Sequence, residues 1–253
     1  MAAIRGGARL VELLHLVFLQ VLPSYLPVTS YVVKGGANLR LFYDSRRRSR
    51  DIDLDYIGDR FHVVEEKIDA ALSSRAFRDL LRVGGIALTE LSKPKQTDTT
   101  RRWKFSVEGP GAFLNSKIEF SARGSVDPEH TIATARSDVG RPIGLRAVRA
   151  EHYLPPAAIR QKVRALANRT HAEPRDVFDL DLLLSSSPAA VTPGELPAAT
   201  LDAAIQATLA LSYDDFRELV VEYIEDDFVH IYDRPEAWEE MVLQVVERLG
   251  ALR

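Results

Sequence analysis

The feature that most constrains the fold of this sequence is a run of alternating aspartates shortly after a pair of glycines. Asp51, Asp53 and Asp55 are separated by single apolar residues. In a β-strand, side chains two positions apart lie on the same face, so the three carboxylates would share one side of a sheet. Like charges at that spacing destabilise a strand unless a cation lies among them. The pattern therefore predicts a strand whose acidic face meets positive charge.

The glycine pair, Gly35 and Gly36, lies between a β-branched run at 31–33 and an amphipathic segment at 37–43. Backbone N–H groups at the start of a helix, together with the helix dipole, favour phosphate. A glycine pair by itself is more often a plain turn. Followed by aspartates that can hold a divalent cation, it indicates nucleotidyl transfer, in which metal-bound carboxylates act on a triphosphate.

Two alternative structures for the aspartates account for less of the pattern. A solvent-exposed edge strand with alternating acids explains the carboxylates but not the glycines. An EF-hand loop starting at Asp51 is excluded, because its sixth position is Tyr56 rather than glycine and its twelfth is His62 rather than glutamate. Mg²⁺ prefers hard oxygen ligands and keeps several waters, so the pair Asp51 and Asp53 suffices. Asp55 is left out, because the far end of the strand can point it at solvent.

The composition is that of a soluble globular protein, with 253 residues, 46% hydrophobic and 27% charged. There are no cysteines, which excludes disulfides and thiolate metal sites. The net charge of −3 gives no global basic field. The apolar stretch 10–22 contains polar residues and is expected to be a buried amphipathic helix, too short and too polar for a membrane span. We therefore expect a cytoplasmic protein with no membrane partner.

Periodicity along the chain predicts an α+β portion, 1–150, followed by a helical portion, 151–253. The expected helices cover 7–22, 37–43, 61–81, 157–168, 174–184, 201–211, 213–228 and 235–249. The expected strands cover 30–34, 51–57, 86–91, 102–107, 113–121 and 131–135, with 93–100 as a polar connection. The segment 185–199 is rich in Ser, Pro, Ala and Gly and is the expected linker.

Three short motifs carry a resemblance to a known family. They are Lys-Gly-Gly at 34–36, Leu-Arg-Leu at 39–41 and Arg-Ser-Arg-Asp-Ile-Asp-Leu at 48–54. In this order and spacing the sequence resembles the AbiEii/AbiGii toxin family, nucleotidyltransferase-like toxins that include the MenT toxins. The resemblance implies a polymerase-β-like nucleotidyltransferase core, a mixed sheet with flanking helices, followed by a C-terminal helical bundle.

The similarity continues downstream, in segments 117–120, 159–166 and 174–180. It implies that Lys162 is an active-site lysine that binds triphosphate as a point charge. It also implies that Asp176 is the last carboxylate of the family and that Glu119 completes the metal site. From the residues alone, Lys117 and Glu119 would be a surface ion pair, and the charges at 174–180 would be helix-surface charges.

By this resemblance the catalytic residues are Asp51, Asp53, Lys162 and Asp176. The metal ligands are Asp51, Asp53 and Glu119, with Mg²⁺ or Mn²⁺ as the cofactor. The nucleoside triphosphate (NTP) is held by Lys34, Gly35, Gly36, Ser49 and Lys162. The wider superfamily has a serine after the glycine, whereas this chain has Ala37, so Ser49 is expected to supply the phosphate-binding hydroxyl.

The resemblance also implies a function and its partners. The expected activity is that of a toxin that transfers a nucleotide from an NTP to RNA, with the 3′ acceptor end of tRNA as target and an antitoxin as partner. The arginine run 46–50 and the basic hairpin 93–104 either contact RNA phosphates or are solvated. Trp103 and Tyr43 either stack on bases or are core residues. A protein or small-molecule acceptor, or a non-catalytic interaction protein with the same fold, remains an alternative.

Overall fold

The computed structural model describes residues 2–124 and 126–253 and divides into two compact units. The first unit consists of Met1–Asp44 and Arg48–Tyr153. The second consists of Ser45–Arg47 and Leu154–Arg253. A short piece of the loop after the second helix therefore belongs to the C-terminal unit, although its neighbours on both sides belong to the first.

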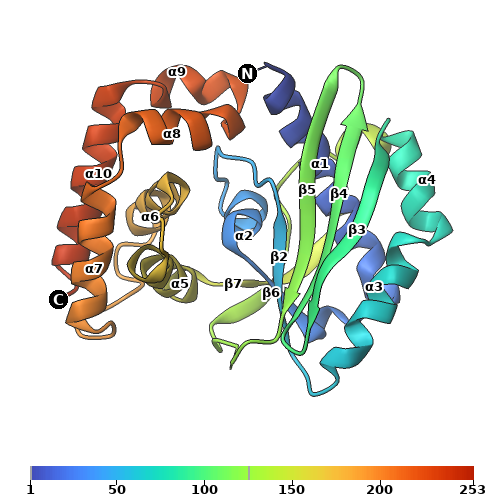
Figure 1. The fold of residues 1–253 in the computed structure, drawn as a ribbon, viewed down its shortest axis with the longest axis horizontal. Helices are drawn as coiled ribbons and strands as arrows, with labels where there is room; N and C mark the ends of the chain where they lie inside the picture. The colour runs from blue at the N-terminus through green and yellow to red at the C-terminus, as the bar shows by residue number, and fades with distance from the viewer. Residues whose placement is uncertain (1, 125) are drawn as a thin grey trace. The chain divides into compact units, whose positions relative to one another are not determined.

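Within the described residues, the first unit contains one seven-stranded mixed sheet (Figure 1). Its strands are β1 Tyr31–Lys34, β2 Ile52–Tyr56, β3 Ala87–Thr97, β4 Thr100–Gly109, β5 Ala112–Ser121, β6 His130–Thr134 and β7 Arg149–Tyr153. Their order in the sheet is β3-β4-β5-β2-β1-β7-β6. The pairs β2–β5 and β1–β7 are parallel, and the other pairs are antiparallel. The predicted mixed sheet of an α+β fold is confirmed.

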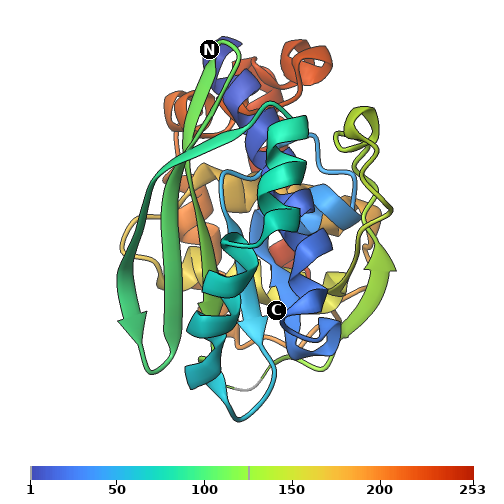
Figure 2. The ribbon, with the colours of Figure 1, turned by 90° about the vertical axis from the view of Figure 1, so that its right-hand side faces the viewer.

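Among the residues that the structure describes, the α-helices of this unit are α1 Ala2–Val21, α2 Gly35–Phe42, α3 Val64–Leu72 and α4 Arg75–Val83. Helices α1, α3 and α4 pack against the sheet in Figure 1, and in Figure 2 α3 and α4 lie in front of α1. Helix α2 packs on β1, β2 and β7, where its Phe42 stacks on His152, and its Arg40 pairs with Glu12 of α1. Apolar residues of α1 recur at helical spacing, and Leu14, Val17 and Phe18 are fully buried.

Most of helix α1 lies in the one segment of the described residues that is long and apolar enough to be a candidate membrane span. By length and composition alone the segment Ile4–Ser24 is able to cross a membrane, contrary to the expectation that it is too short and too polar. However, 72% of its most apolar window is buried inside the protein, as in the core helix of a globular fold. We therefore describe α1 as the central core helix of the first unit.

Helices build the second unit, namely α5 Pro155–Asn168, α6 Pro174–Ser186, α7 Ala198–Leu209, α8 Tyr213–Leu219, α9 Val229–Tyr232 and α10 Pro235–Gly250. Proline opens α5, α6 and α10, because the first helical position needs no N–H donor. A capping box between Ser212 and Asp215 starts α8. Helices α5, α6, α7 and α10 pack on one another.

Two predicted helices are interrupted. The segment 61–81 divides into α3 and α4, because Ser74 starts a new helix by accepting a hydrogen bond from the backbone N–H of Phe77 at 3.1 Å. The segment 213–228 ends as an α-helix at Leu219 and continues in 3₁₀ turns. The α-helix ends there because Val220 has φ −123° and ψ −50°, which is not a helical conformation.

Two strand predictions also differ from the structure. The polar connection 93–100 is instead part of β3 and β4, which continue to a tight turn after Thr97. There Gln96 donates from its side chain to the carbonyl of Arg102 at 2.7 Å. Strand β7 was not predicted, because Glu151 and His152 are polar and interrupt the apolar pattern expected of a buried strand. Both side chains are nevertheless buried in the structure.

Candidate active site

The glycine bend lies beside the second aspartate of the acidic run. Lys34, the last residue of β1, is opposite Asp53 in the antiparallel register. Gly35 follows with φ +66°, a left-handed conformation that residues with a Cβ rarely adopt. A Cβ on Gly35 would lie 3.8 Å from Asp53 Oδ2. The backbone that starts α2 and the Asp53 carboxylate are therefore neighbours.

Asp53 belongs to a group of acids from two adjacent strands. Ile52 and Leu54 of β2 are fully buried on one face of the sheet, which turns Asp53 to the other. Strand β5 runs parallel to β2 and places Glu119 directly beside Asp53. Asp51 immediately precedes β2. The alternating pattern of β2 therefore gives the sheet one buried apolar face and one acidic face, as predicted.

The three carboxylates surround the ammonium group of Lys117. Its Nζ lies 2.7 Å from Asp53 Oδ1 and 3.7 Å from one oxygen each of Asp51 and Glu119. The backbone N–H of Lys117 also donates to Asp51 Oδ1 at 3.1 Å. Burial lowers the pKa of Lys117, but the three carboxylates outweigh burial and raise the pKa above its ordinary value. Lys117 is therefore charged at neutral pH.

A second cation, from β4, contacts one of these acids, Glu119. Arg102 lies opposite Glu119 in the β4–β5 register and donates from Nε to Oε2 at 2.6 Å. We call Asp51, Asp53 and Glu119, with Lys117 and Arg102, the carboxylate cluster. Three negative and two positive groups leave it with a net charge of −1. Its hard oxygen donors suit Mg²⁺ or Mn²⁺.

As arranged here, no group of three or more Asp, Glu, His or Cys side chains within residues 2–124 and 126–253 forms a metal site. In the carboxylate cluster, the point where the three acids converge is taken by the ammonium of Lys117. Three carboxylates are suitable in chemistry and number to bind a divalent cation. Because the ammonium of Lys117 lies among them, the assignment of Asp51, Asp53 and Glu119 as metal ligands stays a prediction.

Asp55 and Lys34 form a separate pair at the β1–β2 ladder. Lys34 Nζ lies 2.5 Å from Asp55 Oδ1, and Tyr153 donates to the other oxygen at 2.7 Å. Burial, followed by the effect of Asp55, raises the pKa of Tyr153 far above its ordinary value. Asp55 is thus held by two partners, and the expectation that it points at solvent is wrong. Lys34, predicted to bind phosphate, is paired with a carboxylate in this structure.

Ser49 lies in the loop that leads into β2. Its hydroxyl donates to the backbone carbonyl of Asp51 at 2.7 Å, and the residue is buried. In the same loop Arg48 is buried and donates from Nε to Glu12 of α1 at 3.0 Å. Arg50 donates from Nε to the carbonyl of Asn115 at 2.9 Å. These contacts fix the backbone on both sides of Ser49.

Two arginines of the run, Arg47 and Arg48, are buried in ion pairs, whereas Arg46 and Arg50 are exposed and make contacts within the protein. In the second unit, Arg46 lies over the ring of Phe228 at 4.1 Å and 3.5 Å from Glu225. Arg47 is buried and donates to both oxygens of Asp179, at 2.9 and 3.0 Å. In the basic hairpin, Lys93 is paired with Glu65 and Asp69. Trp103 is fully buried, and Tyr43 donates to the carbonyl of Tyr153 at 3.0 Å.

Lys162 and Asp176 are brought together in the second unit. Lys162 on α5 lies 2.7 Å from Asp176 Oδ1 and 2.5 Å from Asp179 Oδ2, both on α6. Asp176 and Asp179 have no exposed surface. Arg169 contacts Asp176 as well, and Arg47 contacts Asp179. Three cations facing two carboxylates leave a surplus charge of +1, and we call this group the lysine cluster.

The charges of the lysine cluster are strongly coupled. Burial by itself raises the pKa of Asp179, but Arg47 and Lys162 outweigh it and hold the pKa below its ordinary value. Asp179 is therefore a buried, ionised carboxylate that depends on its two cations. This contradicts the interpretation, from the residues alone, of Asp179 as one of the helix-surface charges at 174–180. On the same helix, Arg175 pairs with Glu173.

Sequence reasoning predicted Lys162 but missed the roles of Lys117 and Arg102 in the carboxylate cluster and of Arg47 in the lysine cluster. The signal for Lys117 was present, since it shares a strand face with Glu119, but it indicated an ordinary surface pair. No sequence signal connects Arg102 with Glu119 or Arg47 with Asp179, because these partners are 17 and 132 residues apart. Sheet register and helix packing create both contacts.

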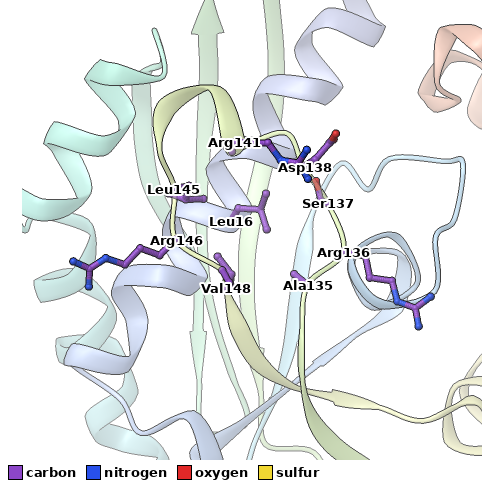
Figure 3. Close-up of a pocket in the computed structure, with 11 residues that line it drawn as sticks. Leu16, Ala135, Arg136, Ser137, Asp138, Arg141, Leu145, Arg146 and Val148 are labelled. Carbon is purple, nitrogen blue, oxygen red and sulfur yellow. The ribbon is translucent and has the colours of Figure 1, made fainter.

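One cavity of the first unit lies apart from these residues (Figure 3). It has a volume of about 260 Å³ and is lined by Leu16 of α1 and by residues between 135 and 148. Figure 3 shows Arg136 and Arg146 extending away from it, and Arg136 donates to Asp44 at 2.6 Å. None of the predicted site residues lines this cavity.

A family model described as nucleotidyl transferase AbiEii toxin, type IV toxin–antitoxin system, matches residues 19–249. No curated protein sequence matches the chain.

The fold is similar to those of solved structures. A putative nucleotidyltransferase from H. pylori has a TM-score of 0.57 and 16% identity, with 98% of each chain covered. JHP933 from Helicobacter pylori has a TM-score of 0.54 and 16% identity, with 95% of this chain and 91% of that chain covered. At this identity both comparisons support the α+β nucleotidyltransferase fold.

Proposed function

Because the chain belongs to the AbiEii family of nucleotidyl transferase toxins, we propose that it transfers a nucleotide from an NTP to RNA, with the 3′ acceptor end of tRNA as its target. A nucleotide added there would prevent aminoacylation and so stop translation. Such a target is cytoplasmic. The type IV toxin–antitoxin family also implies an antitoxin as partner.

The observation that carries the proposal is the position of Gly35 beside Asp53. Nucleotidyl transfer requires a phosphate and a metal-binding carboxylate to meet at one place. The start of α2 presents backbone N–H groups there, and the side chain that a Cβ on Gly35 would approach is Asp53. A plain turn followed by a solvated edge strand does not account for this juxtaposition, since β2 is an interior strand of the sheet.

In this proposal Asp51, Asp53 and Glu119 hold Mg²⁺ or Mn²⁺. The metal, when bound, neutralises the triphosphate and the leaving pyrophosphate. The chain itself supplies carboxylates whose direction is set by the β2–β5 register and by the hydrogen bond from the Lys117 backbone to Asp51. Rigid strands are suited to this task, because a site on strands is held more tightly than a site on loops.

Phosphate binding is assigned to backbone N–H groups, one hydroxyl and two lysines. Gly35 and Gly36 supply backbone N–H groups, and Ser49 supplies a hydroxyl once it leaves the carbonyl of Asp51. Lys34 is available to phosphate when its pair with Asp55 opens. Lys162 binds the triphosphate with the surplus positive charge of the lysine cluster, and Asp176 keeps its ammonium in position at 2.7 Å.

A different acceptor is a second candidate, favoured by the internal pairing of the basic side chains. Arg47, Arg48 and Lys93 have carboxylate partners within the protein, so they do not form an open basic surface for an RNA backbone. A protein or small-molecule acceptor needs no such surface. The metal and triphosphate chemistry would be unchanged.

The test separates these acceptors. Each of the four NTPs, labelled at the α-phosphate, is incubated with the protein and Mg²⁺ or Mn²⁺, and tRNA, total RNA, a protein mixture and an aminoglycoside are offered separately. We expect label on the 3′ end of tRNA, and loss of label with a chelator. Label on protein or aminoglycoside alone would replace the RNA proposal by the second candidate. Absence of label on every acceptor, with intact and folded protein, would contradict both.

A further inference from the structure

The ammonium group of Lys117 lies among the three acids of the carboxylate cluster and has no role in the proposed function. We propose that Lys117 is a resident counter-ion that competes with the divalent cation for Asp51, Asp53 and Glu119 and thereby sets the metal affinity of the site. The inference rests on the proposed function, because it takes these three acids as the metal ligands.

The position of the ammonium supports competition. Its 2.7 Å contact with Asp53 and its equal 3.7 Å separations from the other two acids place it between all three. Mg²⁺ binds carboxylate oxygens at about 2.0–2.1 Å and demands near-octahedral geometry. An ammonium and a divalent cation therefore cannot both occupy the space between these oxygens without strong repulsion.

Charge balance leads to the same conclusion. With Lys117 in place the cluster carries −1, and a divalent cation would bring it to +1. With Lys117 withdrawn the cluster carries −2, and the same ion would bring it to zero. Metal binding is therefore stronger once the ammonium has left, whereas in the metal-free protein the ammonium neutralises part of the negative charge of the three acids.

The side chain can leave without disturbing the sheet. Lys117 is anchored by its backbone in β5, where its N–H holds Asp51, and the ammonium lies at the end of a flexible four-carbon stem. The side chain is 24% exposed, so it has access to water. Withdrawal of the ammonium therefore leaves the β2–β5 register and the direction of the three acids intact.

The test measures metal binding in the absence of nucleotide. The Mn²⁺ dissociation constant of the full chain is determined by calorimetry and by electron paramagnetic resonance for the wild type, Lys117→Met and Lys117→Gln. We expect both variants to bind Mn²⁺ at least about tenfold more tightly, because they remove a competing charge without removing a ligand. The rise in Tm on adding Mn²⁺ should be larger for both variants than for the wild type.

Two controls make the result specific. Lys104 is opposite Lys117 in the β4–β5 register and is exposed, so Lys104→Met should leave Mn²⁺ affinity within about twofold of wild type. Adding Asp53→Asn to Lys117→Met should remove the gain. If both Lys117 variants fold and bind Mn²⁺ no more tightly than wild type, the inference is overturned and the metal site stands. If no variant binds Mn²⁺, the inference falls together with the metal site.

Discussion

Arg48 Nε lies 3.0 Å from Glu12 Oε2, and this buried ion pair joins the loop before β2 to the middle of α1. Arg40 of α2 donates to the other oxygen of Glu12 at 2.9 Å, and Ser137 donates to it as well. One carboxylate in the core helix therefore holds both α2, which starts at the glycine bend, and the loop that leads into the acidic strand.

Replacing Glu12 by alanine should destabilise the protein by about 3–5 kcal/mol, because two buried guanidinium groups lose their carboxylate. Urea unfolding followed by circular dichroism measures the change. Glu66→Ala, at an exposed position of α3, is the matched control and should change the free energy of unfolding by less than about 0.5 kcal/mol. A loss below about 1 kcal/mol for Glu12→Ala would show that the arginines are solvated there.

Gly35→Ala should cost about 1–2 kcal/mol of stability, because φ +66° is unfavourable for a residue with a Cβ. The added methyl would also approach the Asp53 carboxylate, so we expect weaker NTP binding. Gly250→Ala in α10, where a Cβ meets open space, should be neutral or stabilising. Thermal unfolding of the two variants compares them, and equal stability would argue against the left-handed bend.

Asp53→Ala should abolish nucleotide transfer and toxicity while the protein stays folded. The variant removes a carboxylate from the solvent-facing side of β2 and leaves the buried Ile52 and Leu54 in place. Transfer of label and growth of expressing cells are the measurements. Asp59→Ala, in the exposed loop after β2, should keep full activity. A folded and fully active Asp53→Ala would remove the claim of a metal site.

Lys162→Ala should reduce turnover at limiting NTP and should also lower the free energy of unfolding by about 3–5 kcal/mol, because two buried acids lose a shared cation. Assays therefore need a temperature at which circular dichroism shows the variant folded. Arg164→Ala on the exposed side of the same helix should affect neither quantity. Unchanged turnover at limiting NTP in the folded variant would assign Lys162 to stability alone.

The buried His15 predicts a dependence of stability on pH. Burial lowers the pKa of His15 to about 3, whereas an unfolded histidine has a pKa of about 6.5. Between these values the unfolded chain binds a proton that the folded chain does not, so the free energy of unfolding falls as pH drops from about 6.5 towards 3. Burial lowers the pKa of His152 as well, to about 4.

Urea unfolding at several pH values tests this linkage. His15→Leu should show a shallower decline than wild type between about pH 6.5 and pH 4, with the remaining slope due in part to His152. His62→Gln, at an exposed position, should keep the wild-type slope. Identical slopes for His15→Leu and wild type would mean that His15 is protonated in the folded protein.

Local parts of the fold were predictable because short stretches of chain determine them. The strand–glycine–helix segment of β1 and α2, the strand β2 and the proline-initiated helices α5, α6 and α10 all follow from periodicity and from residues with restricted backbones. The interruption of the helix at Ser74 and the full length of β3 and β4 were not predictable. In the sequence, a serine that caps a helix looks like a serine inside one, and a polar hairpin looks like a loop, until their hydrogen bonds are known.

The sequence by itself determined that three aspartates share one side of a strand next to a glycine bend, because the period of a strand is two residues and glycine readily adopts bends that other residues rarely adopt. Only the tertiary structure decided which charges meet those acids. Lys117 and Arg102 reach them through the register of β2, β4 and β5, and Arg47 reaches Asp179 across 132 residues. Electrostatic interaction depends on distance in space, and a linear sequence does not contain that distance.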